Sequence, residues 1–582
     1  MKLKYLIIPA MMTAMALGNT ACNSDNEGVG ESKPTIMDET QGQWVKLRLH
    51  LNGNSATRGN DGGFVNGTDQ ESRIKRLTLT FYDADGKYLS ANTLTEDEIG
   101  AGLIVVSTKS DVQPARLLAW ANIEGAATTL SGLNFAEALA KTCTSGVKGM
   151  DGLMVMTSSS YMKEGQIVYG SAITAENTAL SQNDVLEASA VDVYLDRMAA
   201  KVTINKGDQI SVQLPAYNSE GVTFELKGMA LNGTNRSSYY IKNIADYGFS
   251  LNQWTTAWNV ADLCRSYWAT DPNYMEEGSN LSAYDYRTYK EIAQNHDLTE
   301  YCTENTSGMQ EFNIQNATHV LIVGQYTLQG VRKGANLYLY NGKLMTAQSY
   351  KSLVHNKHPY YVLGVGGNHT ALDNSCYRIT RNGMMGTNAA NVKITLGLEA
   401  DETVYKVAEG AYVSLTVAQA NAELAQEPDG IKYGQGKCYY AAPIEHFGRE
   451  GEVGQYGVVR NHLYQITVTS IKSFGSGIWD PGDDPDDDDP SNPDNPGTDP
   501  DNPDNPGTDP DNPDTPGTDP DDPDDPGIDP GDDPDDDTDD PDDPDEPGEP
   551  IVPEPQEPEE SYMVGLRIKV LDWHVVEQDV DL

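Results

Sequence analysis

The last strand-like pattern of the chain lies at its C-terminus, beyond a long polar stretch. Every second residue there is apolar: Tyr562, Val564, Leu566, Ile568 and Val570. Two more apolar residues, Leu571 and Trp573, come after this alternating stretch. This period of two predicts a β-strand with one apolar face. A single strand leaves its backbone groups unpaired and does not fold alone. We therefore expect the segment 561–582 to pair with a sheet elsewhere.

A segment near the N-terminus, Gln43–Arg58, carries the same pattern. Its apolar positions are Val45, Leu47, Leu49 and Leu51. Leu47–Leu51 (LRLHL) and Leu566–Val570 (LRIKV) share the order apolar, basic, apolar, basic, apolar. The two strands are therefore candidates for the same position in a sheet, although short alternating strands also match by chance.

Short strand patterns separated by turn signals fill the middle of the chain. Clear examples are Arg76–Phe81 (RLTLTF), His319–Leu328 (HVLIVGQYTL) and Val458–Ile471 (VVRNHLYQITVTSI). Asn336–Leu344 (NLYLYNGKL) predicts a hairpin with a type I′ Asn-Gly turn, and Leu133–Thr142 predicts a short helix. Many short strands between turns indicate two β-sandwich domains, which we place at 59–206 and 207–479.

The segment 480–560 consists almost wholly of Asp, Pro, Gly, Asn and Glu. The ten residues NPDNPGTDPD of Asn492–Asp501 recur at Asn502–Asp511. The segment holds 36 acidic and no basic residues, so −12 of the net charge of −48 remains for the rest of the chain. Proline and like charges predict a disordered tether. At ~3.1 Å per residue its 81 residues could span on the order of 250 Å, enough to carry the terminal strand to another molecule.

The N-terminus has the pattern of an export signal. Lys2 and Lys4 precede an apolar run, Leu6–Leu17, and Asn19–Cys22 resembles a bacterial lipobox, although an aliphatic residue is usual where Asn19 stands. We expect residues 1–21 to be a lipoprotein signal peptide and Cys22 to be lipidated. An ordinary secretory signal with an incidental cysteine is the alternative.

A loop rich in Gly, Asn and Ser follows the first alternating strand. Arg58 and Gly59 lie in it, and exposed loops of small polar residues are sites of proteolysis. A plain turn that contains an arginine is the alternative reading.

The sequence gives no sign of catalysis, of a cofactor or of a metal site. HExxH, GxSxG and Walker motifs are absent, and the one close histidine pair, His355 and His358, has no evident third ligand. Five cysteines lie downstream of Cys22, and none of them forms a CxxC pair: Cys143, Cys264, Cys302, Cys376 and Cys438. They could form two disulfides at most, or they could be buried free thiols. The acidic chain has no basic stripe for nucleic acid.

A surface glycan-binding lipoprotein is the competing class of function. Trp254, Trp258 and Trp268, together with nearby tyrosines, would stack on sugars if they were exposed, and they would be core residues otherwise. Such a protein would not need two matching strands at its ends.

The chain resembles the major subunit (fimbrilin) of the short, or minor, fimbriae of Bacteroidales, in the type V pilus family. The resemblance rests on Tyr456–Gly475 (YGVVRNHLYQITVTSIKSFG), on the Pro/Asp tether and on the terminal VLDWHVVEQDVDL. The lipobox, the arginine loop and LDRMAAKVTI occur in the expected order. The long acidic repeat and the Tyr239–Glu311 region depart from the family pattern.

The resemblance implies a mainly β fold of two transthyretin-like β-sandwich domains, a disordered tether and a C-terminal donor strand. It also implies assembly by donor-strand exchange at the cell surface. An arginine-specific or trypsin-like protease would cut a lipid-anchored outer-membrane precursor after Arg58 and remove the propeptide 22–58 with its strand Val45–Leu51. The segment 561–582 of another copy would then fill the vacated groove. Further partners would be accessory tip and anchor pilins.

Overall fold

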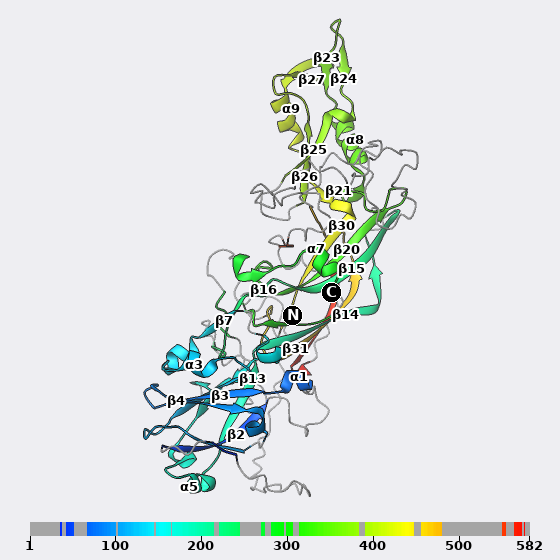
Figure 1. Ribbon diagram of the computed structural model, residues 1–582. Helices are drawn as coiled ribbons and strands as arrows, with labels where there is room; N and C mark the ends of the chain where they lie inside the picture. The colour runs from blue at the N-terminus through cyan, green and yellow to red at the C-terminus, as the bar shows by residue number, and fades with distance from the viewer. Residues whose placement is uncertain are drawn as a thin grey trace, which may run out of the picture.

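The computed structural model describes residues 35–37, 42–51, 67–100, 103–144, 147–163, 166–214, 220–244, 269–273, 281–295, 298–306, 313–382, 390–446, 455–479, 550–553, 564–572 and 575–576. The described parts form an elongated molecule (Figure 1). The first domain lies at one end, a second domain lies in the middle, and a smaller module lies at the other end. Among the residues described, no helix has both the length and the apolarity needed to cross a membrane.

One curved sheet builds the first domain. Its strands follow the order β1 (Thr35–Met37), β5 (Leu103–Ser107), β2 (Trp44–Leu51), β13 (Val191–Arg197), β8 (Met156–Ser158), β6 (Arg116–Ala121), β3 (Arg76–Tyr82) and β4 (Tyr88–Thr95). Two short strands pair beside this path, β11 (Ser171–Ala172) with β6 and β12 (Thr178–Ala179) with β2. A hairpin of β9 (Ser160–Lys163) and β10 (Gln166–Tyr169) and the strand β7 (Thr142–Thr144) complete the strands of this part.

Alternating residues of this sheet form the core of the first domain. Leu77, Leu79 and Phe81 of β3 are fully buried with Val45 and Leu47 of β2. On the other face, Trp120 packs against two short helices, α3 (Ala126–Leu130) and α4 (Phe135–Leu139). Other α-helices in the described part of the domain are α1 (Asp69–Ser72), α2 (Glu96–Ile99) and α5 (Gln182–Glu187).

The second domain is a β-sandwich. One sheet has the order β19 (Thr299–Thr303), β14 (Ala199–Val212), β31 (His462–Ile471), β33 (Val564–Asp572) and β34 (Val575–Val576), and the other has the order β15 (Val222–Asn232), β20 (His319–Leu328), β30 (Lys437–Pro443) and β32 (Ser476–Gly477). Val202 and Ile466 of the first sheet share a core with Val320 and Ile322 of the second. The helix α7 (Tyr289–Ala293) covers the outer face of the second sheet, and β16 (Thr234–Asn235), β17 (Ser237–Tyr239) and β18 (Tyr284–Asp285) lie in the connections.

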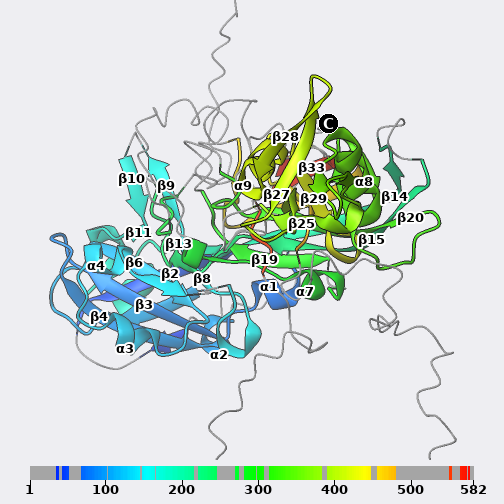
Figure 2. The same ribbon diagram turned by 90° about the horizontal axis from the view of Figure 1, so that it is seen from above.

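A third module is inserted between β20 and β30. One sheet contains β22 (Lys343–Met345), β21 (Leu337–Tyr340), β29 (Gly430–Tyr433), β26 (Asn391–Leu396) and β25 (Tyr377–Arg381), and the other contains β24 (His369–Ala371), β23 (Tyr361–Leu363), β27 (Thr403–Ala408) and β28 (Ala411–Thr416). The helices α8 (Ala347–Lys357) and α9 (Val417–Leu424) pack on these sheets in a separate core. Figure 1 shows this module at the end of the molecule opposite the first domain, and in Figure 2, which is seen from above, it lies over the second domain.

The predicted mainly β fold class is confirmed. The predicted type I′ hairpin is present, because Asn341 and Gly342 have φ angles of 50° and 75°. The predicted helix at 133–142 is α4, which is shorter. The chain passes from the first sheet to the second at Met198, so the predicted boundary near residue 206 lies inside β14, and the prediction of one sandwich over 207–479 did not separate the third module.

Candidate functional site

The N-terminal alternating strand is β2, and it lies inside its sheet. Its backbone pairs antiparallel with β5, from Trp44 opposite Ser107 to Arg48 opposite Leu103. On its other edge it pairs parallel with β13, from Leu47 opposite Val191 to Leu51 opposite Leu195. Loss of β2 would therefore leave unpaired backbone groups on β5, on β13 and on the short strand β12, which also pairs with β2.

The side chains of β2 divide as its sequence pattern predicts. Val45 and Leu47 are fully buried, and Leu49 is half-buried against the same core. Between them, Lys46 Nζ donates a hydrogen bond to Leu186 O (2.8 Å), and Arg48 lies 3.5 Å from Asp192 at the surface. Trp44 is buried against Val185 of α5, a contact that the alternation did not reveal.

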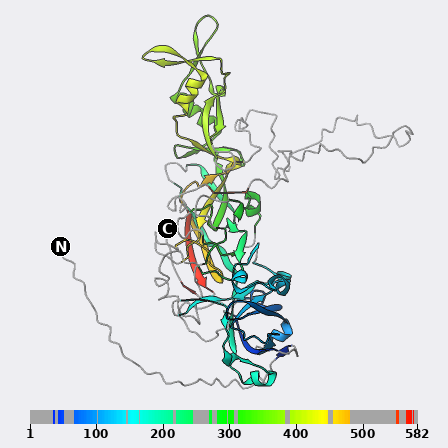
Figure 3. The ribbon, with the colours of Figure 1, turned by 90° about the vertical axis from the view of Figure 1, so that its left-hand side faces the viewer.

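The C-terminal alternating strand is β33, and it lies in the second domain. It pairs antiparallel with β31, from Val564 opposite Ile471 to Asp572 opposite His462. The register sets Leu566, Ile568 and Val570 opposite three fully buried residues, Val468, Ile466 and Tyr464. Directly opposite residues in an antiparallel ladder belong to the same face. These three positions are therefore on the core side of the sheet, and the strand is drawn in red in Figure 3.

The two alternating strands are not brought together in one chain. β2 lies between β5 and β13, whereas β33 lies beside β31 in the other domain. The structure thus holds one strand of each kind in a separate sheet, and their exchange between copies stays a prediction. Leu571 is described as part of β33, while Cys22, Arg58, Gly59, Tyr562 and Trp573 lie outside the described residues.

The strands β13 and β14 follow each other almost without a break, and β2 pairs with the first of them and β31 with the second. β13 ends at Arg197 and β14 begins at Ala199. Backbone groups of a strand alternate between its two edges. Tyr194 O accepts from Ser159 N, next to β8, and Ile204 N donates to Leu298 O, next to β19. On the opposite edge, Ala199 O accepts from Asn461 N, just before β31 (2.7 Å). This alternation indicates that β2 and β31 follow the same edge, so that β2 ends where β31 begins.

A buried carboxylate on α1 joins the two domains beside this point. Glu71 is 2% exposed and accepts hydrogen bonds from Lys201 Nζ of β14 (2.7 Å) and from Tyr301 OH of β19. Arg197 of β13 donates from Nε to Glu71 O (2.7 Å) and from Nη2 to Ser72 Oγ (3.0 Å). Burial raises the pKa of Glu71, but the bonds from Lys201, Tyr301 and Thr68 outweigh it and hold the pKa below its usual value.

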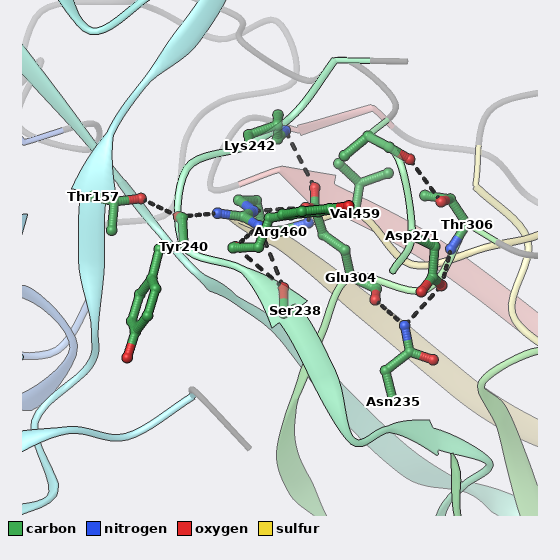
Figure 4. A network of polar contacts seen from close by, with 12 residues as sticks. Thr157, Asn235, Ser238, Tyr240, Lys242, Asp271, Glu304, Thr306, Val459 and Arg460 are labelled. Carbon is green, nitrogen blue, oxygen red and sulfur yellow. Dashed lines mark hydrogen bonds and ion pairs between the residues drawn. The ribbon is translucent and has the colours of Figure 1, made fainter. Parts of the chain in front are cut away.

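A second buried network joins the domains through Arg460, as Figure 4 shows. Arg460 is 1% exposed and donates from Nε to Glu304 Oε2 (2.7 Å). It also donates to Tyr240 O and Tyr239 O (2.8 Å each), while Thr157 Oγ1 of β8 donates to Tyr240 O (2.6 Å). Sequence reasoning quoted Arg460 inside a family segment but assigned it no role. Arg460 and Glu304 are both buried, and the network includes protein groups of both domains, so it connects the domains.

The remaining predictions concern chemistry that the chain was expected to lack. Within the described ranges, no group of three or more His, Cys, Asp or Glu side chains is placed to hold a metal ion. The four described cysteines form no disulfide, and burial raises the pKa of the Cys302 thiol to about 12. Cys264, Trp254, Trp258 and Trp268 lie outside the described residues, so the glycan-binding alternative has no structural support from them.

Two family models match the chain. Residues 37–323 match the model described as Fimbrillin-A associated anchor proteins Mfa1 and Mfa2, which spans the first domain and reaches into β20. Residues 431–579 match the model described as Major fimbrial subunit protein type IV, Fimbrillin, C-terminal, which includes β30, β31 and β33. No curated protein sequence matches the chain.

Solved structures that are similar to the chain include two from Porphyromonas gingivalis. A fimbrilin is 13% identical with a TM-score of 0.34, over 77% of this chain and 93% of that one. The tip fimbrial protein Mfa3 with a C-terminal truncation is 12% identical with a TM-score of 0.27, over 74% of this chain and 95% of that one.

Proposed function

The chain is a fimbrial subunit of the fimbrillin family, the type V pilus family that its sequence resembles, and we propose that it polymerises by donor-strand exchange. In this proposal the precursor is lipidated at Cys22 and anchored at the outer membrane. A trypsin-like protease cuts after Arg58 and removes β2, and Tyr562–Leu582 of another copy replaces it. The filament mediates adhesion and ends in accessory tip and anchor pilins.

The observation that carries this proposal is the internal position of β2. Its removal exposes two strand edges and uncovers the space that Val45 and Leu47 fill. The groove that β2 leaves is called the slot. At ~1.5–3 kcal/mol per fully buried apolar side chain, burial of four or five such residues of an incoming strand in the slot stabilises the complex strongly. The tail strand offers apolar residues at the same spacing.

The polymer form follows from the placement of the two strands. A copy gives a strand from its C-terminal tail and receives one in its first domain, which are different surfaces. Such head-to-tail contacts generate open filaments rather than closed rings. While β2 remains in place the slot is filled, so the uncut precursor is unable to accept a strand.

The cleavage step predicts a specific failure. Arg58→Ala leaves full-length lipoprotein on the cell and no filaments, because β2 is never released. The matched control is Arg332→Ala, which removes an exposed arginine from a turn of the second domain and leaves assembly normal. N-terminal sequencing of sheared surface material gives Gly59 as first residue in the control. Normal filaments from Arg58→Ala would refute the cleavage step.

A further inference from the structure

A short apolar segment interrupts the acidic tract close to its end. Ile551–Val552 is the only pair of adjacent aliphatic residues between positions 480 and 560. Although the whole tract was predicted to be a disordered tether, Pro550–Pro553 is placed against the second domain, and Ile551 is 1% exposed. The apolar pair supplies the burial that the surrounding Asp and Pro lack.

Ile551 completes the core on the outer face of the β15–β20–β30 sheet. It packs in one cluster with Ile292 of α7, Leu321 and Val323 of β20, and Tyr439 of β30. All of these side chains are buried, so Ile551 and α7 together cover this face. Ile551 is therefore a core residue of the second domain, although the acidic tract separates it in sequence from the other residues of this cluster.

Backbone and side-chain hydrogen bonds fix the segment in a strand-like position. Ile551 N donates to Arg287 O (2.7 Å), and Pro550 forms an antiparallel bridge with Thr288. The buried Asn232 donates to Ile551 O (2.9 Å), and Gln315 Nε2 donates to Pro553 O (3.0 Å). Contacts from three separate parts of the domain, at Asn232, at Arg287–Thr288 and at Gln315, thus hold the segment.

The other end of the acidic tract is also fixed to the molecule. Trp479 is buried in the core of the third module, with Lys432 Nζ 4.4 Å from the centre of its ring and Arg381 Cζ at 5.1 Å. Ile478 O accepts from Gly434 N (2.9 Å). The 70 residues 480–549 therefore join two fixed points, and only the ten residues 554–563 separate Pro553 from β33.

We propose that Pro550–Pro553 is an anchor that sets the reach of the donor strand, so that the acidic repeats form a closed loop and do not act as its tether. This inference rests on the proposed strand exchange and changes one element of it. Ten extended residues reach about 35 Å, whereas the 84 residues from 480 to 563 reach on the order of 280 Å. The donor strand therefore samples only positions close to the anchor.

The anchor also raises the effective concentration of the donor strand toward a copy that already lies beside the second domain. Once the first domain of another copy lies beside the anchor, strand entry takes place within that complex of two copies. Effective concentration there falls with roughly the −3/2 power of linker length, so an arm of ten residues favours strand entry roughly 25-fold over a linker of 84. The number of ten-residue repeats is then free to vary without effect on assembly. The number of repeats affects the rate of assembly only when Pro550–Pro553 is released from the domain.

The anchor itself is tested in the uncut monomer, where no donor strand passes between copies. Hydrogen exchange at the Ile551 amide is slow in the full chain and speeds up at least about tenfold in Ile551→Asp, the factor that loss of one buried aliphatic side chain implies. Val552→Asp is the matched control, because Val552 is only half-buried and takes no part in the core cluster. If Ile551→Asp does not fold, Ile551→Ala replaces it. Fast exchange at Ile551 in the unchanged chain would overturn the anchor.

The reach is tested by assembly of cut subunits. Deletion of three repeats, Asn492–Asp521, leaves the assembly rate of the otherwise unchanged chain as it was. In the Ile551→Asp background, assembly is slower and the same deletion speeds it roughly twofold, because the linker falls from 84 to 54 residues. A change of rate on deletion in the unchanged chain would overturn the inference. Failure of strand exchange itself appears separately, as filaments from a cut chain that lacks Tyr562–Leu582.

Discussion

Glu71 lies where the two domains meet and binds a residue from each of two strands of the second domain. Its carboxylate takes hydrogen bonds from Lys201 and Tyr301, and its backbone carbonyl takes one from Arg197 of the first domain. α1 follows the proposed cleavage loop, so these bonds keep the chain downstream of the cut attached to both domains. The capping box of Thr68 and Glu71 starts the helix at this point.

Removal of this carboxylate is expected to weaken the fold in a pH-dependent way. Glu71→Gln lowers the free energy of unfolding by ~1–3 kcal/mol at pH 7, because Lys201 loses its buried partner. The pKa of Glu71 is lower in the folded chain than its ordinary 4.5. Its contribution is therefore complete above pH 4.5 and is lost as the pH falls through the folded pKa. Urea unfolding at pH 7 and at pH 3 measures the difference.

The matched control for Glu71 is Glu96, an exposed carboxylate paired with Arg73. Glu96→Gln is expected to leave stability almost unchanged at both pH values, since exposed pairs contribute little. An equal cost for both substitutions, or a cost for Glu71→Gln that does not shrink in acid, would contradict the role given to Glu71.

Single strands were the elements that the sequence predicted best. Alternation identified β2 and β33, and the short strand patterns RLTLTF and HVLIVGQYTL identified β3 and β20, because these patterns depend only on neighbours in the chain. The third module escaped prediction for the opposite reason. Tyr350 of α8 is buried by Tyr338 and Tyr340 of β21, with ring centroids 6.0 and 4.8 Å away, and such partners are set by the fold.

The same limit applies to the candidate site. The strands and the arginine loop are local patterns, so the sequence predicts them. The positions of Glu71, Arg460 and Ile551 depend on partners more than 100 residues away, such as Lys201 for Glu71 and Asn232 for Ile551. Ile551–Val552 is an exception, because an apolar pair in an acidic tract is a local signal of burial.

The register of β33 gives a prediction about which face of the donor strand matters. Ile568→Asp is expected to abolish assembly, because position 568 is opposite the buried Ile466. Its neighbour Lys569 stands on the other face, so Lys569→Asp leaves assembly intact. Electron microscopy of the cut proteins counts the filaments. Equal effects of the two substitutions would show that the apolar face of the strand does not determine its binding to the acceptor copy.

At the scale of the molecule, the giving and receiving parts lie in different domains, and Pro550–Pro553 holds the giving part close to the second domain. A slot in another copy must therefore come near this anchor before exchange begins. The buried networks around Glu71 and Arg460 connect the two domains, so that slot and anchor keep a fixed relation within each copy.

The most direct measurement of strand exchange mixes two variants that are each unable to polymerise. A chain that lacks Tyr562–Leu582 has an open slot after trypsin treatment but no donor, and an Arg58→Ala chain has a donor but a filled slot. Mass photometry after the protease is inhibited is expected to show each variant alone as a monomer. The mixture is expected to form a one-to-one complex that grows no further. Monomers alone in the mixture, or filaments from either single variant, would contradict the account.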